Sequence, residues 1–438
     1  MTTETPPIAP APIILRGEAG LYWADVATAG LSLRFDHARE DRGALTFDVT
    51  VFTLTPGGRP VEYDFLRLNL MAVRAKKELA SMVTAATGAP DAEKLVNLVC
   101  ADIRRRHRQG RPIVNLADVV PQPMTWRLWP LLPNGLPALF VAEGGTGKTT
   151  VCAICAVAIT SGMAFAGLRP TKGRVLYLDY ESSAEDMARL VHAITSAIPD
   201  VTTFPDVYYR SCSRPLVDEQ EELRAAVMEI KADLVIVDSV SRAAACDDEN
   251  KAGPVSMFFN ALHTFGWRDD SGSHVATSLS CAHTQKGDGG NKTARGSGNW
   301  QDQARSVWRL NSTLDGTTHE IGLFDVKRNL RSQQKPVGLR VDYVYGAAQS
   351  DDAERTLDEV KVSRADVRDN PALAAHMSAP DRIIASLRGG ARSLDGIVAE
   401  TGLPLEKIRH DVSYLKKTGK VVAVGVGNWG LPSTTEVT

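Results

Sequence analysis

Hydrophobic and polar positions follow different periods in different parts of the chain, and this divides it into regions. Between residues 13 and 71, apolar residues recur at every second position in four runs, which predicts strands with one buried and one solvated face. The runs cover residues 20–26, 31–35, 45–54 and 61–68. Two segments of helical period follow, at about 72–87 and 90–108. We predict a small α+β domain over 13–120, after a disordered Pro-, Thr- and Ala-rich tail over 1–12.

Short, continuous apolar runs alternate with amphipathic helical segments between residues 121 and 346. Runs of this kind are typical of strands that are buried on both faces. The pattern therefore predicts an α/β domain with a mainly parallel sheet between layers of helices. The predicted parallel strands are 137–142, 174–180, 206–210, 233–238 and 275–282, and antiparallel edge strands are expected near 305–310, 320–327 and 338–345. Such domains bind ligands at the carboxyl ends of their parallel strands.

The C-terminal part of the chain shows a third pattern. Residues 347–377 are rich in acidic residues and predict a solvated linker, partly helical. Residues 378–438 contain three amphipathic helical segments and then two short apolar strands, which predicts a winged-helix domain. Its third helix carries cations that suit DNA, but Glu406 and Asp411 interrupt them, so a purely protein-binding domain stays open. The cations are Lys407, Arg409, His410, Lys416 and Lys417.

The composition excludes some classes of protein but does not indicate a function. The chain has 438 residues, which is enough for about three domains, and its net charge of -2 excludes a uniformly basic coat. Contacts with nucleic acid must then come from local patches. The six cysteines form no set with zinc-finger spacing. The N-terminus has no signal-like pattern and no apolar run approaches the ~18 residues of a membrane span, so we expect a reduced, cytoplasmic protein with no membrane partner.

A glycine-rich loop directly follows the predicted strand 137–142. It reads Ala142-Glu-Gly-Gly-Thr-Gly-Lys-Thr-Thr150 and leads into an apolar helix. This is the pattern of a phosphate-binding loop, in which backbone N–H groups surround the phosphates, Lys148 reaches the β- and γ-phosphates and the Thr149 hydroxyl ligates Mg²⁺. Ala142 replaces the usual first glycine. The residues predicted to bind ATP are Gly144, Gly145, Thr146, Gly147, Lys148, Thr149 and Thr150.

Two other buried strands end in carboxylates. The run 232–238 ends at Asp238, which we predict to assist Thr149 in holding Mg²⁺. The run 175–181 ends at Glu181, a carboxylate placed to polarise an attacking water as general base. The alternative for Glu181 is a capping role at the start of the next helix.

The order of motifs resembles that of RepA-type hexameric replicative helicases, within the RecA-like ATPases. The resemblance covers about residues 125–345 and includes the Glu181 strand end. Its other segments are Asp238-Ser-Val-Ser-Arg242 with Asp247–Asn250 and Gly253-Pro254, His283-Thr-Gln-Lys-Gly287, Arg295-Gly-Ser-Gly298 and Asp302-Gln-Ala-Arg305. It implies that His283 senses the γ-phosphate or couples hydrolysis to DNA-binding loops. It also implies a cation supplied by the neighbouring subunit, and the sequence does not separate Arg305 from Arg328 for this role.

The structural alternatives are a core histidine for His283 and a surface ion-pair arginine for Arg305.

The resemblance implies an ATP-hydrolysing homo-oligomer, expected as a hexamer, that acts in DNA replication of a phage or mobile element. Single-stranded DNA would run through a central channel, where the basic, glycine-rich segment 286–298 can follow its backbone, and the winged helix can contact duplex DNA. The extra flanking domains and Ala142 depart from the minimal helicases, so the resemblance supports ATPase activity more strongly than processive unwinding.

Two other classes of function stay open. The first is a nucleotide-dependent partition switch, because the loop resembles that of ParA-type proteins, although Glu143 stands where that family has its signature lysine. The second is a loader or recombination mediator that binds DNA without unwinding it.

Overall fold

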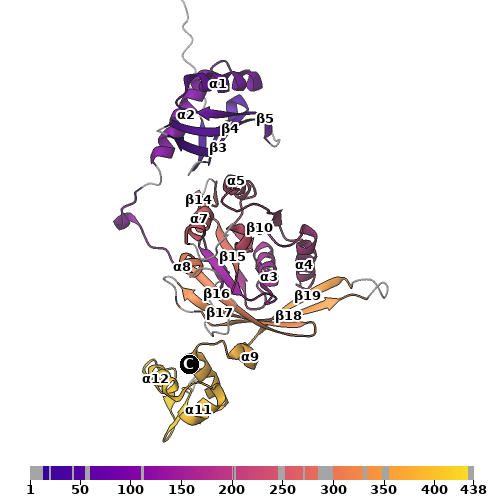
Figure 1. Ribbon diagram of the computed structural model, residues 1–438, viewed down its shortest axis with the longest axis vertical. Coiled ribbons are helices and arrows are strands. Elements are labelled where there is room, and N and C mark those ends of the chain that lie inside the picture. The colour runs from indigo at the N-terminus through magenta and orange to yellow at the C-terminus, as the bar shows by residue number, and fades with distance from the viewer. Residues whose placement is uncertain are drawn as a thin grey trace, which may run out of the picture. The chain divides into compact units, whose positions relative to one another are not determined.

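The computed structural model describes residues 13–432 apart from short gaps (Figure 1). The gaps are 19–20, 42–43, 55–59, 110–112, 200, 202–203, 245–251, 270–271, 285–298, 329–331, 333 and 348–354. The predicted tail over 1–12 lies outside the described residues. Contacts divide the chain into two compact units. Unit 1 comprises Met1–Pro123, Glu219–Lys231 and Thr264–His274, and unit 2 comprises Met124–Asp218, Ala232–His263 and Val275–Thr438.

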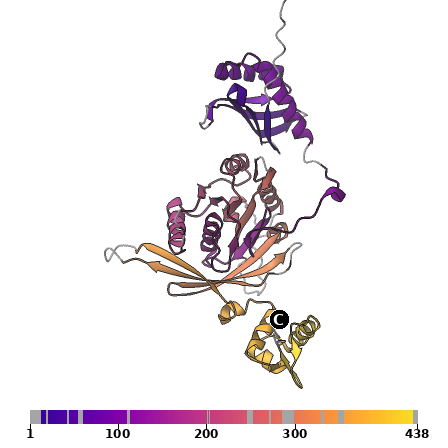
Figure 2. The same cartoon turned by 180° about the vertical axis from the view of Figure 1, so that it is seen from behind.

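Unit 1 contains a five-stranded antiparallel sheet whose strands follow one another in chain order. The strands are β1 (Ile14–Glu18), β2 (Leu21–Val26), β3 (Leu31–Asp41), β4 (Ala44–Thr53) and β5 (Val61–Asn69). Two helices, α1 (Val73–Thr87) and α2 (Ala92–Gln109), cover one face of the sheet, as the two opposite views show (Figures 1 and 2). Strand β1 was not among the predicted strands.

The period of two in the sequence is the period of burial in this sheet. Leu31, Leu33 and Phe35 of β3 are fully buried against the helix layer, while Arg34 between them points to the other face. The helices contribute apolar residues at helical spacing, among them Leu79 and Val83 of α1. The remaining short elements of unit 1 are η1 (Ala27–Ala29), η2 (Leu116–Asp118), α5 (Gln220–Ile230) and β13 (Gly266–Asp269), which pairs with β14 (Gly272–Val275).

Unit 2 is built on a nine-stranded sheet with the order β11-β10-β12-β15-β8-β16-β17-β18-β19. The first six strands of this order are parallel, and the last three are antiparallel. The strands are β8 (Pro137–Ala142), β10 (Val175–Asp179), β11 (Val207–Ser211), β12 (Leu234–Asp238), β15 (Thr277–His283), β16 (Ser306–Asp315), β17 (Thr318–Arg328), β18 (Val337–Tyr345) and β19 (Leu357–Ala365). This agrees with the predicted mainly parallel α/β architecture.

Helices flank this sheet. They are α3 (Lys148–Ser161), α4 (Ala184–Ser196), α6 (Val240–Ala243), α7 (Ala252–Leu262) and α8 (Asn299–Gln303), and a small sheet of β6 (Trp126–Trp129), β7 (Leu132–Pro133) and β9 (Arg169–Pro170) adjoins them. All residues of β8, β10 and β12 are buried, as expected for strands with both faces covered. Helix α3 is buried on nearly all sides, which explains why its sequence is apolar throughout.

The position of β16 corrects one prediction. We expected an antiparallel edge strand near 305–310, but β16 lies inside the sheet, parallel to β8 on one side and antiparallel to β17 on the other. Its first three residues are fully buried, and the Trp308 indole N–H donates a hydrogen bond to the Leu131 carbonyl oxygen. A strand that has one parallel and one antiparallel neighbour has no distinct local pattern.

The predicted linker over 347–377 is also wrong in part, because residues 357–365 form β19. This strand pairs with β18 over eight residue pairs and contributes the fully buried Val360 to the main core. It alternates apolar and polar positions, but Asp358, Glu359 and Lys361 made the segment look solvated. The described remainder of the range includes the short helix α9 (Pro371–Ala374).

The C-terminal module of unit 2, residues 379–432, has its own small core. Helices α10 (Ala379–Ser386), α11 (Leu394–Thr401) and α12 (Leu405–Lys417) pack through Ile383, Ile397 and Ile408, and η3 (Leu387–Gly389) follows α10. A three-stranded sheet joins β20 (Arg392–Ser393), β22 (Asn428–Gly430) and β21 (Val422–Ala423). The side chains of Ser378 and Ser393 cap α10 and α11.

None of the helices in the described part of the chain is both long and apolar enough to cross a membrane.

The role of β19 is testable by truncating its buried valine. Val360→Ala should lower the free energy of unfolding of unit 2 by about 2 kcal/mol, because it leaves a cavity in a closed core. Denaturant titration followed by tryptophan fluorescence measures this change. Lys361→Ala, at an exposed position of the same strand, is the control and should change stability by less than about 0.5 kcal/mol. Equal, negligible effects of both variants would restore the linker interpretation.

Candidate functional site

The glycine-rich loop joins β8 to α3 in a conformation that requires glycine. Gly147 is the N-cap of α3 and has a φ of 86°, in the left-handed region. A β-carbon at this position would lie 2.9 Å from the Ile321 Cδ1 atom and 3.0 Å from the His319 Cε1 atom. Glycine is therefore required both by the turn and by the close approach of β17. The loop presents the free N–H groups at the start of α3 to an anion.

Lys148 folds back over this loop. Its ammonium group donates hydrogen bonds to the carbonyl oxygens of Glu143, at 2.9 Å, and Ala142, at 3.3 Å. It also lies 3.3 Å from Nδ1 of His283, the last residue of β15. Burial lowers the pKa of Lys148, while Asp238 and Glu181 act in the opposite direction. The lysine is thus held by carbonyl oxygens that phosphate oxygens can replace.

Asp238 lies at the carboxyl end of β12, two strands away from the loop. One of its oxygens accepts hydrogen bonds from the Thr149 hydroxyl, at 2.7 Å, and from the Tyr177 hydroxyl, at 2.9 Å. Burial raises the pKa of Asp238 although both hydrogen bonds oppose the shift. A carboxylate and a hydroxyl in contact are hard oxygen donors of the kind that Mg²⁺ selects, so these residues fit the predicted metal ligands.

Glu181 is positioned by its neighbours at the end of β10. The Asp179 carboxylate accepts hydrogen bonds from the backbone N–H groups of Glu181 and Ser182, which fixes the turn after the strand. The Ser239 hydroxyl donates to the Glu181 carboxylate at 2.5 Å. The cap of α4 is the side chain of Ser183, so the alternative capping role of Glu181 is not realised.

These residues line one pocket of about 460 Å³. One wall contains the loop and the strand ends of β10, β12 and β15. The other wall consists of residues from the β16–β17 turn and from β18. The lining residues are Gly145, Gly147, Lys148, Thr149, Thr150, Glu181, Asp238, His283, Leu314, Gly316, Thr317, His319, Tyr343 and Tyr345. Of the predicted residues, Gly144 and Thr146 belong to the same loop without lining the pocket, and Thr146 donates a hydrogen bond to the Glu143 carbonyl oxygen.

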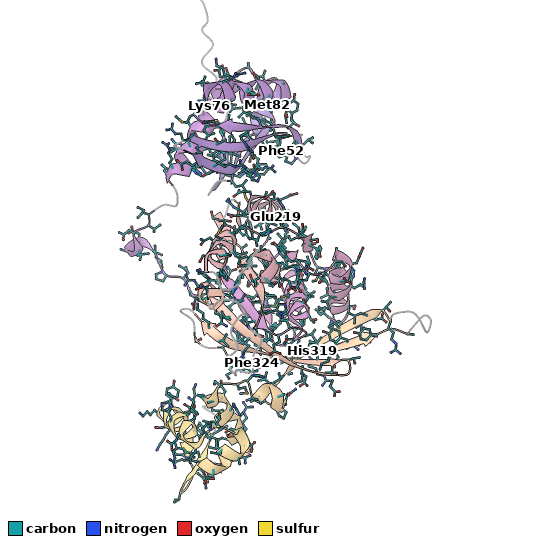
Figure 3. The ribbon with its side chains drawn as sticks, in the orientation of Figure 1. Phe52, Lys76, Met82, Glu219, His319 and Phe324 are labelled. Atoms are coloured by element: carbon teal, nitrogen blue, oxygen red, sulfur yellow. The ribbon has the colours of Figure 1, made fainter. Side chains whose placement is uncertain are left out.

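The second wall was not found from the sequence. His319 of β17, labelled in Figure 3, is only 5% exposed and packs against Gly147. Burial lowers the pKa of its imidazole, which keeps the ring neutral near the phosphate loop. The Tyr343 and Thr150 hydroxyl groups lie 3.1 Å apart. The Asp315-Gly316 pair is typical of a hairpin turn, but nothing in the sequence places that hairpin over the loop.

Both candidate trans-acting arginines lie at the amino ends of the parallel strands, opposite the pocket. The Arg305 N–H donates to the carbonyl oxygen of Pro137, the first residue of β8, whereas the phosphate loop follows its last residue. Arg328 is the register partner of Ser306, so its backbone lies at the same end. The Arg305 side chain is exposed. The motif segments 247–250 and 286–298 and Asn329 lie outside the described residues.

Comparison with known proteins supports the class of this domain. Residues 105–289 match a family model described as an AAA domain, and this range contains the loop, Glu181, Asp238 and His283. No curated protein matches the chain. Among solved structures it is similar to the flagellar accessory protein FlaH from Methanocaldococcus jannaschii, with 15% identity and a TM-score of 0.34, over 53% of this chain and 92% of that one. The family match over this range, the glycine-rich loop and the mainly parallel sheet agree with an AAA-type nucleotide-binding domain.

The requirement for glycine at position 147 can be tested without nucleotide. Gly147→Ala should lower the free energy of unfolding by about 3 kcal/mol, because it combines a left-handed backbone with two close contacts. Gly144→Ala is the matched control, since its added methyl group meets no atom within 4 Å. The control should stay within about 1 kcal/mol of the parent. Chemical denaturation measures both, and equal effects would contradict the proposed packing of β17 on the loop.

The depressed pKa of His319 predicts a contribution to pH-dependent stability. The unfolded chain takes up a proton on this residue near its ordinary pKa of about 6.5, which the folded chain resists, so stability is lost as the pH falls below that value. His319→Gln should therefore lose less stability than the parent between about pH 7.5 and 5.5. Denaturant titrations at both pH values measure the difference. An identical loss in both proteins would show that His319 does not contribute.

Proposed function

We propose that this chain is an ATP-hydrolysing, oligomeric DNA motor, and specifically a replicative helicase of the RepA type from a phage or mobile element. The observation that supports it best is that the predicted site residues lie at opposite ends of the parallel strands. Lys148, Asp238 and Glu181 line one pocket at the carboxyl ends, and both candidate arginines lie at the amino ends. A site completed by a second copy of the chain is the simplest arrangement that brings the pocket and an arginine together.

The residues of the pocket account for hydrolysis of a triphosphate. The N–H groups at the start of α3 and the Lys148 ammonium bind its β- and γ-phosphates. Thr149 and Asp238 would hold Mg²⁺, which when bound neutralises charge on the phosphate oxygens. Glu181, held by Ser239, orients a water molecule and takes its proton. His283 lies beside Lys148, where it can respond to the presence of the γ-phosphate.

The distance across the sheet favours a neighbouring subunit as source of the remaining cation. Strand β8 has six residues, so its ends are separated by roughly 17 Å at the usual rise per residue. This exceeds the reach of the Arg305 side chain, which starts at the far end. An arginine from another copy can instead approach the open pocket and donate its fixed fork of N–H groups to phosphate oxygens.

The C-terminal module is included in the proposal as a winged helix that contacts DNA. Three of the five cations predicted on α12 are engaged: Lys407 and His410 with the buried Asp411, and Arg409 with Glu406. Lys416 and Lys417 in the last turn of α12 remain as the better candidates for phosphate contacts, and Lys416 also lies over the Trp429 ring. The duplex contact is therefore expected at the carboxyl end of this helix.

Strand displacement on a forked DNA tests the motor function. Lys148→Ala should abolish displacement, and Glu181→Gln should retain nucleotide binding but lower the hydrolysis rate by about 100-fold or more. Glu185→Gln, an exposed acid four residues beyond Glu181, is the control and should unwind normally. Unwinding retained in both site variants would end the proposal. DNA-stimulated hydrolysis without displacement in the parent would favour a loader or mediator.

Mixing two inactive variants tests the shared site. Lys148→Ala subunits still offer their arginines, and Arg305→Ala subunits still offer an intact phosphate loop. A mixture should therefore regain a measurable part of the ATPase rate if Arg305 acts in a neighbouring site. The same mixture with Arg328→Ala decides between the two arginines. If neither mixture exceeds the sum of its components, the site is not shared in this way.

A further inference from the structure

The sheet of unit 1 has a second face that its own two helices leave uncovered. We call this the open face, meaning the side of β1–β5 opposite α1 and α2. Phe52, labelled in Figure 3, belongs to the sheet, whereas Lys76 and Met82 belong to the helix layer. Residues that alternate with the buried core of the domain must point to this face. Among them are Trp23, Arg34 and Phe52.

Aromatic rings and a guanidinium group gather on the open face. The Trp23 and Phe52 rings lie 5.5 Å apart between centroids, tilted by 30°. The Arg34 guanidinium lies 5.9 Å from the Trp23 ring centroid and 5.6 Å from that of Phe52. All three side chains are only partly buried. Planar groups of this kind, arranged side by side, can stack on flat ligands.

The aromatic character continues to the edge of the sheet. Trp23 pairs with Arg34, Arg34 with Thr50, and Thr50 with Phe65, so these residues form one row across β2 to β5. Phe65 is 71% exposed and Tyr63, two residues before it, is 48% exposed. Tyr63 lies at a bulge in β5, where the register with β4 shifts. Large aromatic residues this exposed on an edge strand have no role in the core of the domain.

Charge on the open face is arranged with the cations outermost. Three ion pairs join Arg16 to Asp25, Arg34 to Asp36 and Arg67 to Asp48. In each pair the arginine side chain is the more exposed partner, at 45% against 21%, 29% against 9% and 58% against 33%. At these three pairs a ligand therefore meets guanidinium groups and rings first, with the carboxylates beneath them. Near His37 the face also meets Glu222 of α5, 3.9 Å from the His37 Nε2 atom. This order suits a flexible polyanion that carries planar groups.

We propose that the open face binds single-stranded nucleic acid, with bases stacked on Phe65, Tyr63 and the Trp23–Phe52 pair, and with phosphates near the exposed arginines. Bases in a single strand can be splayed onto such a surface, whereas those in a duplex are stacked within it. The binding is independent of the nucleotide chemistry of unit 2. It assigns a ligand to the N-terminal domain, whose role the sequence does not indicate.

The same arrangement predicts a shallow dependence on salt. Because each arginine already has a carboxylate partner, at most three phosphate contacts form, and the slope of log affinity against log salt should be about -2 or shallower. Stacking should supply most of the affinity, at roughly tenfold to a hundredfold per aromatic residue removed.

Fluorescence anisotropy of the full-length chain with a labelled oligothymidylate of about 20 nucleotides measures this binding. Phe65→Ala should weaken it by about tenfold, and Tyr63→Ala combined with Phe65→Ala by about a hundredfold. Leu98→Ala is the control, because Leu98 is an exposed apolar residue, at 43%, that lies on α2 in the helix layer and away from the open face. An oligouridylate of the same length compares RNA with DNA, and duplex DNA should compete poorly.

Photo-crosslinking with bromouracil-substituted oligonucleotide and mass spectrometry locates the contact on the full-length chain. Adducts on Trp23, Phe52, Tyr63 or Phe65, with the basal ATPase rate unchanged in Phe65→Ala, would support the proposal. Adducts confined to unit 2, with unchanged affinity in Phe65→Ala, would overturn it while leaving the proposed motor function intact. Absence of any single-strand binding would overturn it as well. Self-association that Phe65→Ala abolishes would overturn it by identifying the open face as an interface between copies.

Discussion

The parallel register of β10, β12, β15 and β8 is the constraint on which the site depends. It places Asp179 beside Asp238 and His283 beside Ala142, so residues distant in the sequence meet at the carboxyl ends of the parallel strands. The Asp238 carboxylate is buried among these strand ends, and hydrogen bonds from the Thr149 and Tyr177 hydroxyl groups satisfy one of its oxygens. The strand ends and the loop are therefore fixed as a set, and a change in register would separate all of them at once.

The antiparallel half of the sheet gives this site its second wall. Strand β17 presses His319 and Ile321 against Gly147, and β18 brings the Tyr343 hydroxyl to Thr150. The phosphate loop is thus supported by β8 on one side and contacted by a distant hairpin on the other. Because packed interfaces tend to switch between discrete arrangements, a ligand that moves the loop has a direct route to the hairpin. In the proposed ring, the opposite end of this hairpin lies near the edge that carries Arg305.

Local patterns predicted the elements that are buried on both faces or strictly amphipathic. The strand 137–142 was predicted with the observed ends, and β10, β11, β12 and β15 were found within two residues at each end. Their apolar runs are bounded by polar residues, so the signal is strong. The predictions for β16 and β19 were wrong because pairing and burial there come from neighbours distant in sequence. The charged residues of β19 stay solvated at the sheet edge, while Val360, with the partly buried Leu357 and Val362, packs into the core.

The sequence by itself determined which residues are candidates for a triphosphate site, namely the glycine-rich loop with its lysine and hydroxyl and the carboxylates at strand ends, because such a site requires particular residue types at fixed local spacing. Only the tertiary structure decided that Ser239 holds Glu181, that Ser183 rather than Glu181 caps α4, and that His319 and Tyr343 close the pocket. It also decided that both arginines lie at the amino ends of the parallel strands, and that aromatic residues lie together on one face of the N-terminal sheet. Those facts depend on strand order and register, which no local spacing encodes.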